Sequence, residues 1–240
     1  MKSNELLIVE GLLLGFEDES CPREPITFIP SNVKDISSEA YISEDVTVDP
    51  SNPYLYSDNG CIYRRGADGD TLVFFSGEFE KTWNEDFFDE QTSETIVVRR
   101  HEGMMPYRMP DNVSYVEIHS LAGWYVDEII LSKSFKPTSS NLHSIAAARL
   151  SRIEVDPENP WLASVDGVLY DKVFKTLLLY PETKQEPSFT LPSSVKKISS
   201  GIAFSYPSGS VSSMIVCPEF PYAFETMKDL FPSLETITTK

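Results

Sequence analysis

Residues that usually carry chemistry are scarce in this 240-residue chain, which has three cysteines and three histidines. Cys21, Cys61 and Cys217 lie far apart and form no C-x-x-C pair, so the ligand spacing of a zinc site is missing. At most one disulfide can form, and free thiols suit a reducing compartment. No apolar run reaches the roughly 18 residues of a membrane span, so we expect no membrane insertion.

Basic residues are also scarce. The chain has 20 Lys and Arg against 37 Asp and Glu, which gives a net charge of −17. Its basic runs are short, such as Arg64-Arg65 and Arg99-Arg100-His101. Nucleic acids and anionic membrane surfaces need clustered basic residues, so neither is expected as a partner. An acidic surface would instead attract a basic protein.

Catalytic and cofactor motifs are missing as well. The chain has no G-x-S-x-G elbow, no G-x-G-x-x-G loop and no P-loop. His101, His119 and His143 lie in different segments without an i+4 partner. Asp68-Gly69-Asp70 and the NEDFFDE run (84–90) supply oxygen ligands for calcium, but neither has the spacing of an EF-hand. We therefore expect a protein that is not an enzyme and holds no metal or cofactor.

The N-terminal segment resembles a secretion signal only superficially. Its apolar run is broken by Glu10 and Gly11, and no small-residue cleavage site follows. If the numbering begins at the native start, the expected location is the cytoplasm. The run Ile8–Phe16 instead predicts a hairpin that turns at Glu10-Gly11 and shields the open end of a core.

A duplicated segment dominates the rest of the chain. Val46–Phe75 and Ile153–Pro181 share one register: Val48 and Val155, Pro53 and Pro160, Gly60 and Gly167, and Tyr63 and Tyr170 each lie 107 positions apart. Each copy predicts a short strand stopped by Asp-Pro and Asn-Pro, and then an inserted hairpin that turns at Asn-Gly or Asp-Gly. The acids in these pairs are explained by turn chemistry.

A second pattern places a strand before a proline. It runs Ile29-Pro30, Val33, Ile36, Ala40-Tyr41, and recurs at Leu191–Phe204 and, more weakly, at Met109–Ala122. Proline ends the hydrogen bonding of the strand and turns the chain. The Ala-aromatic pair then predicts a short helical turn.

A third pattern, apolar-x-x-apolar-x-apolar, follows these. It occurs at Val126–Leu131, Leu150–Val155, Val211–Val216 and Leu234–Thr239; the first two are 24 residues apart and the last two 23. A period of about 20–29 residues with one short strand per unit is typical of a leucine-rich solenoid. The predicted fold class is therefore a repeat solenoid, mainly β with short helical turns, of about six irregular units.

These motifs resemble the BspA-like leucine-rich-repeat family. LPSSVKKISSGIAF and IPSNVKDISSEAY match its repeat, and the DPENPWLASVDGVLYDK block is similar to the insertion that its members carry. The resemblance implies an irregular right-handed stack with inserted β-hairpins. It also implies a bacterial recognition or adhesion protein, often at the cell surface or secreted.

We expect one leucine-rich-repeat domain over residues 1–240. Its predicted parts are a capping hairpin (1–25), a first repeat with an inserted hairpin (26–78), an irregular insertion (79–106), and further repeats with a second inserted hairpin (156–187) and a C-terminal cap (107–240). In the irregular insertion, NEDFFDE predicts a short helix capped by Asn84 and TIVVRR predicts a strand. Pro221–Leu230 predicts a helix, and SLETIT a terminal strand with an open edge.

Candidate binding residues follow from this arrangement. Tyr54 and Trp161 occupy one slot of the two insertions and are candidates for an aromatic anchor. Residues predicted on the concave strand face are Ile129, Glu154, Val155 and Met214. We expect a protein partner, with a glycan as the second partner class, and predict no oligomeric state.

Two rival functions stay open. A hydrolase would use paired carboxylates near Asp49 and Asp58 or near Asp156 and Asp166. A pocket with two such acids beside aromatic residues would favour the hydrolase, and a smooth acidic strand face would favour binding. A self-associating scaffold would instead pair through the terminal strand.

Overall fold

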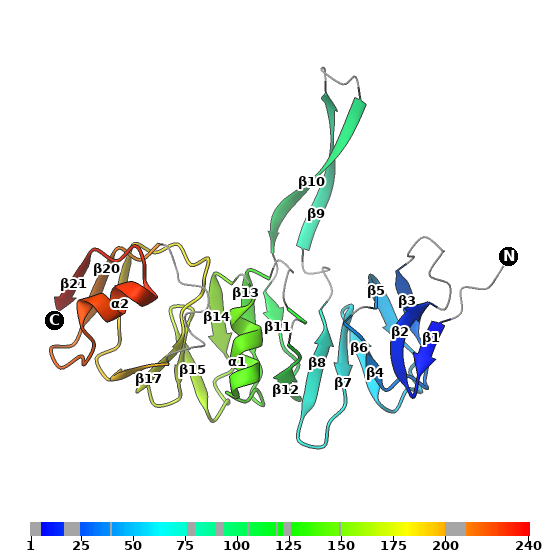
Figure 1. Ribbon diagram of the computed structural model, residues 1–240, viewed down its shortest axis with the longest axis horizontal. Coiled ribbons are helices and arrows are strands. Elements are labelled where there is room, and N and C mark those ends of the chain that lie inside the picture. The colour runs from blue at the N-terminus through cyan, green and yellow to red at the C-terminus, as the bar shows by residue number, and fades with distance from the viewer. Residues whose placement is uncertain are drawn as a thin grey trace.

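The chain forms an elongated stack with its two ends at opposite extremes (Figure 1). The computed structural model describes residues 6–16, 25–38, 40–75, 80–89, 94–104, 106–118, 120–121, 126–148, 150–199 and 210–240. Only the backbone is described for residues 16, 44, 80–89 and 94–104. Strands dominate the described residues, with two helices among them. The molecule is a β-solenoid, so the predicted fold class is confirmed.

Parallel strands from successive coils make the three sheets of one side of the stack. The sheets comprise β3 (Ile26–Ile29) with β5 (Ile42–Val48); β11 (Tyr107–Arg108), β13 (Glu128–Leu131) and β14 (Arg152–Val155); and β18 (Ser188–Thr190), β20 (Ser213–Val216) and β21 (Thr236–Thr239). Every strand pair in these sheets is parallel. Among the described strands β21 pairs only with β20. The predicted edge is present, and self-association through it stays a prediction.

Proline turns the chain after three of these strands, as predicted. The amide of the residue three positions on donates to the proline carbonyl each time: Val33 to Pro30 at 3.2 Å, Val113 to Pro110 at 2.9 Å, and Val195 to Pro192 at 2.9 Å. Because proline has no N–H to continue a ladder, the strand ends and the chain enters a tight turn. The same sequence pattern therefore produces the same corner in three coils.

Both inserted segments form three-stranded antiparallel meanders. The first comprises β6 (Leu55–Asp58), β7 (Cys61–Arg64) and β8 (Asp70–Phe74), and the second β15 (Leu162–Val165), β16 (Val168–Asp171) and β17 (Thr176–Leu179). Each third strand then pairs in parallel, β8 with β12 (Val113–Val116) and β17 with β19 (Lys197–Ile198). The predicted hairpins and their shared register are confirmed.

The N-terminal hairpin is also confirmed. β1 (Leu6–Val9) and β2 (Leu12–Phe16) pair in antiparallel fashion around Glu10 and Gly11, which have φ of 54° and 91°. Two positive φ values in succession define the tight turn that matches strand twist. β2 also pairs with β4 (Asp35–Ile36), so the hairpin covers the end of the stack.

The predicted helix at NEDFFDE is wrong. Residues 84–89 lie in β9 (Glu80–Asp89), which pairs with β10 (Glu94–Met104) in a long two-stranded ribbon that stands out from the stack (Figure 1). TIVVRR lies in β10, so its prediction as a strand is confirmed. The backbone register places Phe87 opposite Ile96, and aromatic and β-branched residue types favour strands over helices.

Two helices pack beside the strands. α1 (Ser139–Ala146) begins at Thr138, whose hydroxyl accepts the Asn141 amide at 3.2 Å, and α2 (Phe224–Leu230) confirms the predicted C-terminal helix. At Ala40 the expected helical turn is a single hydrogen-bonded turn, in which the Ala40 amide donates to the Ser37 carbonyl at 3.0 Å. The corresponding pairs, beginning at Ala122 and Ala203, lie outside the described residues.

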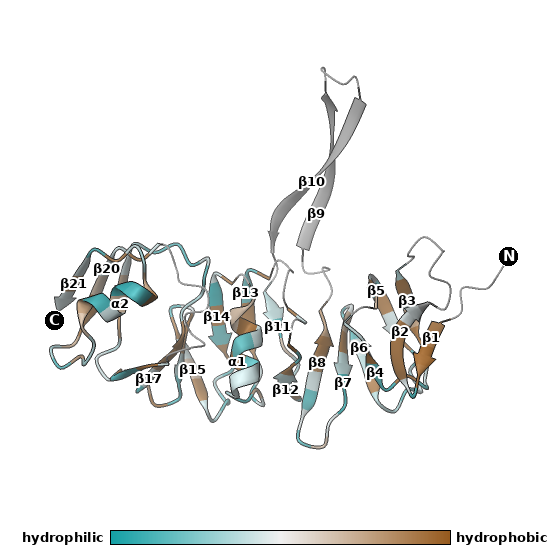
Figure 2. Cartoon of the chain, in the orientation of Figure 1, coloured by the Kyte–Doolittle hydropathy of each residue, from teal (hydrophilic) through white to brown (hydrophobic). Residues whose placement is uncertain are grey.

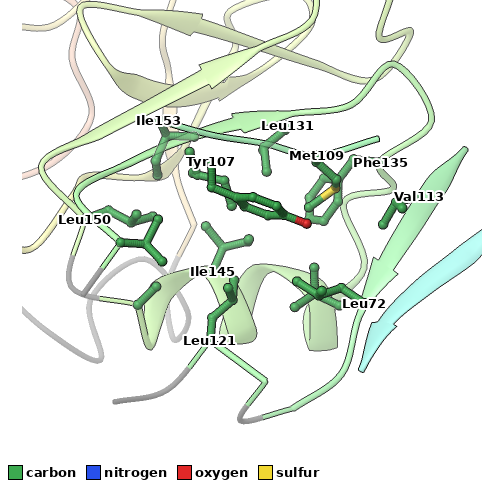
Figure 3. Packing of buried hydrophobic residues seen from close by; sticks show 14 of the residues in the cluster. Leu72, Tyr107, Met109, Val113, Leu121, Leu131, Phe135, Ile145, Leu150 and Ile153 are labelled. Atoms are coloured by element: carbon green, nitrogen blue, oxygen red, sulfur yellow. The ribbon is translucent and has the colours of Figure 1, made fainter. Parts of the chain in front are cut away.

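Among the described residues, buried side chains form three clusters along the stack. Hydrophobic segments lie mainly on the strands, and polar segments lie on the connecting loops and on α2 (Figure 2). In the central cluster Tyr107 lies among Leu72, Met109, Phe135 and Ile145 (Figure 3). Its hydroxyl is 3.0 Å from the hydroxyl of Tyr63. Packing of the first insertion against the parallel strands therefore joins neighbouring coils.

Candidate binding surface

Tyr54 and Trp161 lie at the same corner of the two insertions, just before β6 and β15. Their exposed fractions are 42% and 44%. Lys34 Nζ lies 5.7 Å from the centre of the Tyr54 ring. The sequence prediction that these residues share a slot is confirmed, and both side chains are accessible to a partner. Their role in binding stays a prediction.

A buried asparagine fixes the backbone at each aromatic residue. Asn52 Oδ1 accepts the amides of Tyr54 and Leu55 at 2.8 Å, and Asn159 Oδ1 accepts those of Trp161 and Leu162 at 2.9 Å. Each asparagine is at most 3% exposed. Each aromatic residue is therefore presented from a rigid corner, which lowers the entropy lost when a partner binds.

Two of the predicted binding residues on the strand face are wrong. Ile129 and Met214 are 0% and 1% exposed, so they pack in the core and no partner can reach them. Successive side chains of a strand point to opposite faces, and these two point inward. Glu154 and Val155 are half-buried, and Glu154 forms an ion pair with Arg152. The neighbours of Ile129 and Met214 that point away from the core are Ile130 and Ile215.

A groove of about 510 Å³ lies beside the first insertion. It is lined by residues of β3, the end of β5, the following turn and the hairpin: Phe28, Thr47, Val48, Asp49, Pro50, Leu55, Tyr56, Ser57 and Arg65. Its size is within the range of ligand clefts. Phe28 contributes an apolar wall that is 49% exposed.

Tyr56 is the best-anchored wall of this groove. Its ring stacks on Tyr63 with centres 5.0 Å apart, and its hydroxyl donates to Asp70 Oδ2 at 2.9 Å. Asp70 is 8% exposed and also accepts from Asn112 and from the Gly66 amide. Burial raises the pKa of Tyr56 to about 12. The phenol therefore stays neutral and serves as a fixed support.

Arg65 lies over this support. Its guanidinium carbon is 4.6 Å from the centre of the Tyr56 ring, a cation–π geometry. Within the described residues Arg65 has no carboxylate partner, whereas its neighbour Arg64 pairs with Asp35 and Glu117. The groove thus contains a positive group held in place by an aromatic ring and open to a ligand.

One carboxylate, Asp49, lines the groove. Its Oδ1 accepts from the hydroxyl and amide of Ser51, and these hydrogen bonds lower its pKa. Asp58, the second acid of the proposed hydrolase pair, does not line the groove. In the second insertion Asp156 accepts the Glu158 amide, and Asp166 forms the turn with φ of 52°. Turn formation accounts for the positions of these acids.

Metal ligation has little support in the described part of the chain, where no group of three or more His, Cys, Asp or Glu residues is placed to hold an ion. The Asp70 oxygens of the Asp68-Gly69-Asp70 candidate are already hydrogen-bonded. His143 is exposed on α1, while His119 and the side chain of His101 lie outside the description. Neither Cys61 nor Cys217 is part of a disulfide. No described helix is long and apolar enough to cross a membrane.

Sequence reasoning missed Phe28, Ser57 and Arg65 as groove residues. Arg65 was hidden because the two copies were compared for what they share, and the second copy has Lys172 at this position. Their difference was informative: Thr47 and Tyr56 of the first copy correspond to Glu154 and Ala163 of the second. Those two substitutions change the groove and leave the scaffold intact.

No protein-family model matches the chain, and no curated protein matches it. Similar solved structures include the pneumococcal vaccine antigen PcpA, with 15% identity, a TM-score of 0.43, and coverage of 94% of this chain and 51% of that one. A leucine-rich-repeat protein from Eubacterium ventriosum has 13% identity, a TM-score of 0.42, and coverage of 97% and 68%. A leucine-rich cell-surface protein from Faecalibacterium prausnitzii has 13% identity, a TM-score of 0.40, and coverage of 89% and 47%. The chain thus spans about half the length of the first and third.

Proposed function

We propose that this chain is a non-enzymatic recognition module of the BspA-like type, which binds a protein partner through the surface of its two insertions. The observation that carries the proposal is the pair of exposed aromatic residues, Tyr54 and Trp161, each held by a buried asparagine at an equivalent corner. Tyrosine and tryptophan dominate binding energy at protein interfaces. A role in adhesion at a bacterial surface belongs to the same proposal.

The solenoid supports this function physically. Its coils place the two insertions at successive positions along one stack, so a single partner can engage both (Figure 1). Repeat proteins commonly use such extended surfaces for binding. The net charge of −17 attracts a partner with a basic surface over a range set by the ionic strength.

Affinity enrichment with matched variants tests the proposal. The immobilised full chain is compared with the double variant Tyr54→Ser/Trp161→Ser and with Val173→Ser as the control. Val173 is 66% exposed in the second insertion, so its change alters exposed apolar area without touching the anchor corner. We expect one or more proteins to be captured by the wild type and the control and lost, by at least about tenfold, with the double variant. Equal capture by all three chains would refute the proposal.

A further inference from the structure

The groove of the first insertion and the matching place in the second differ in one informative way. Ser57 and Ser164 are equivalent, and each hydroxyl accepts a backbone amide at 3.1 Å, from Val48 and Val155 respectively. Ser164 also donates to the carboxylate of Glu154 at 2.8 Å. Within the described residues, the hydroxyl hydrogen of Ser57 has no acceptor.

The missing acceptor follows from one substitution. Glu154 of β14 pairs with Ile130, and Thr47 of β5 pairs with Phe28 at the same register position. Thr47 is short, and its hydroxyl donates to the carbonyl of Thr27 at 3.3 Å. In the second copy, therefore, a carboxylate of the chain itself occupies the place that is open in the first.

Positive charge accompanies the carboxylate in the second copy. Arg152 Nη2 lies 2.6 Å from Glu154 Oε1. The first copy has the acid Asp45 in place of Arg152, so the cation of the second copy is replaced there by a negative charge. Arg65 supplies one from another direction, since it lines the groove on top of the Tyr56 ring. The same groove is thus lined by a hydroxyl donor and by a guanidinium that has no carboxylate partner among the described residues.

We infer that the groove of the first insertion binds a carboxylate side chain of the partner, presented by an acidic peptide segment. Ser57 donates a hydrogen bond to it and Arg65 supplies the countercharge, as Ser164 and Arg152 do for Glu154. Charge-assisted hydrogen bonds of this kind are the stronger ones in proteins. Asp49 does not forbid the ligand, because the equivalent Asp156 lies two residues from Glu154 in the second copy.

A peptide suits the rest of the groove. Phe28, Val48 and Leu55 provide apolar walls that residues beside the acid can contact, and the internal precedent for the ligand is itself a glutamate side chain. The inference rests on the proposed function in that the ligand is part of a protein. The negative net charge of the chain attracts a basic surface at longer range than the groove contacts act. One partner can therefore carry both a basic surface and an acidic peptide segment.

Nuclear magnetic resonance titration of the full chain tests the inference. The probe is the peptide acetyl-Val-Glu-Val-amide, and its matched control is acetyl-Val-Gln-Val-amide, which lacks only the charge. We expect the glutamate peptide to shift the amide signals of Val48 and Ser57 and to bind at least about tenfold more tightly than the control. Equal binding of the two peptides, or no shift at these amides up to about 10 mM, would overturn the inference.

A second set of variants places the residue of one insertion copy at the equivalent position of the other. Thr47→Glu should place an internal carboxylate in the groove and abolish peptide binding, while Thr47→Val should retain it. Glu154→Thr should open a second site, seen as new shifts at Val155 and Ser164. Arg65→Met should weaken binding by at least about tenfold. Thermal unfolding confirms that each variant is folded, and unchanged binding in Thr47→Glu contradicts the assignment.

Two further outcomes are decisive. Tighter binding of glucuronate than of the peptide would replace the peptide with an acidic sugar and overturn the assignment. If the Tyr54- and Trp161-dependent partner is captured but the peptide does not bind, the groove inference fails and the proposed function stands. If the peptide binds but no such partner is captured, the proposed function fails and the groove inference stands.

Discussion

Asn52 and Asn159 make the same four hydrogen bonds in different coils of the stack. Each side-chain amide donates to two carbonyls of the preceding coil, those of Pro30 and Val33 for Asn52 and of Ser132 and Phe135 for Asn159, all at 2.9 Å. Each Oδ1 accepts two amides of its own insertion. Asparagine therefore joins successive coils at the corner where the exposed aromatic residue is presented.

Replacing either asparagine with alanine should destabilise the stack substantially. Asn159→Ala leaves two buried carbonyls and two amides without partners, and unsatisfied buried groups cost about 1–3 kcal/mol each. We expect a loss of at least about 4 kcal/mol of unfolding free energy, measured by denaturant titration. Ser51→Ala is the control, because Ser51 is exposed, and it should cost less than about 0.5 kcal/mol. A loss of that small size in Asn159→Ala would contradict the joining role.

Gly167→Ala should destabilise the second insertion by more than about 1 kcal/mol. Gly167 has φ of +76°, and an added Cβ would lie 2.7 Å from Arg152 Cγ. Gly60 has φ of +75° at the equivalent turn, so Gly60→Ala should be destabilising for the same conformational reason. Thermal unfolding measures both. Unchanged midpoints in the two variants would count against the shared register of the insertions.

Stability should fall at alkaline pH. Burial raises the pKa of Tyr56 to about 12, and it also raises the pKa values of Tyr63, Tyr107, Tyr170 and Tyr180. In the unfolded chain tyrosine ionises near about pH 10, so above that value the unfolded state loses protons that the folded state keeps. The stabilisation is thus complete below about pH 10 and is lost as the pH rises towards 12. Unfolding free energies at about pH 9 and about pH 11 test this, and equal values would contradict it.

The sequence predicted the scaffold better than the binding surface. Turn residues such as Pro30, Gly60 and Gly167 have strong local preferences, so the corners and insertions could be derived from them. The β9–β10 ribbon could not, because its strands are stabilised by pairing with each other. Ile129 and Met214 were assigned to the wrong face of their strands, since a repeat pattern of apolar residues does not by itself say which face is outward. The groove required knowing that β3, β5 and β6 meet.

Photochemical cross-linking tests the central claim, binding through the insertions, most directly. A benzoyl-phenylalanine is placed at Tyr54, at Trp161 or, as the control, at Val173 of the full chain, which is then irradiated in native extract. We predict that the two anchor positions cross-link to the same protein and that Val173 gives no such product. Absence of a shared product at Tyr54 and Trp161, or an equal yield at Val173, would contradict the account.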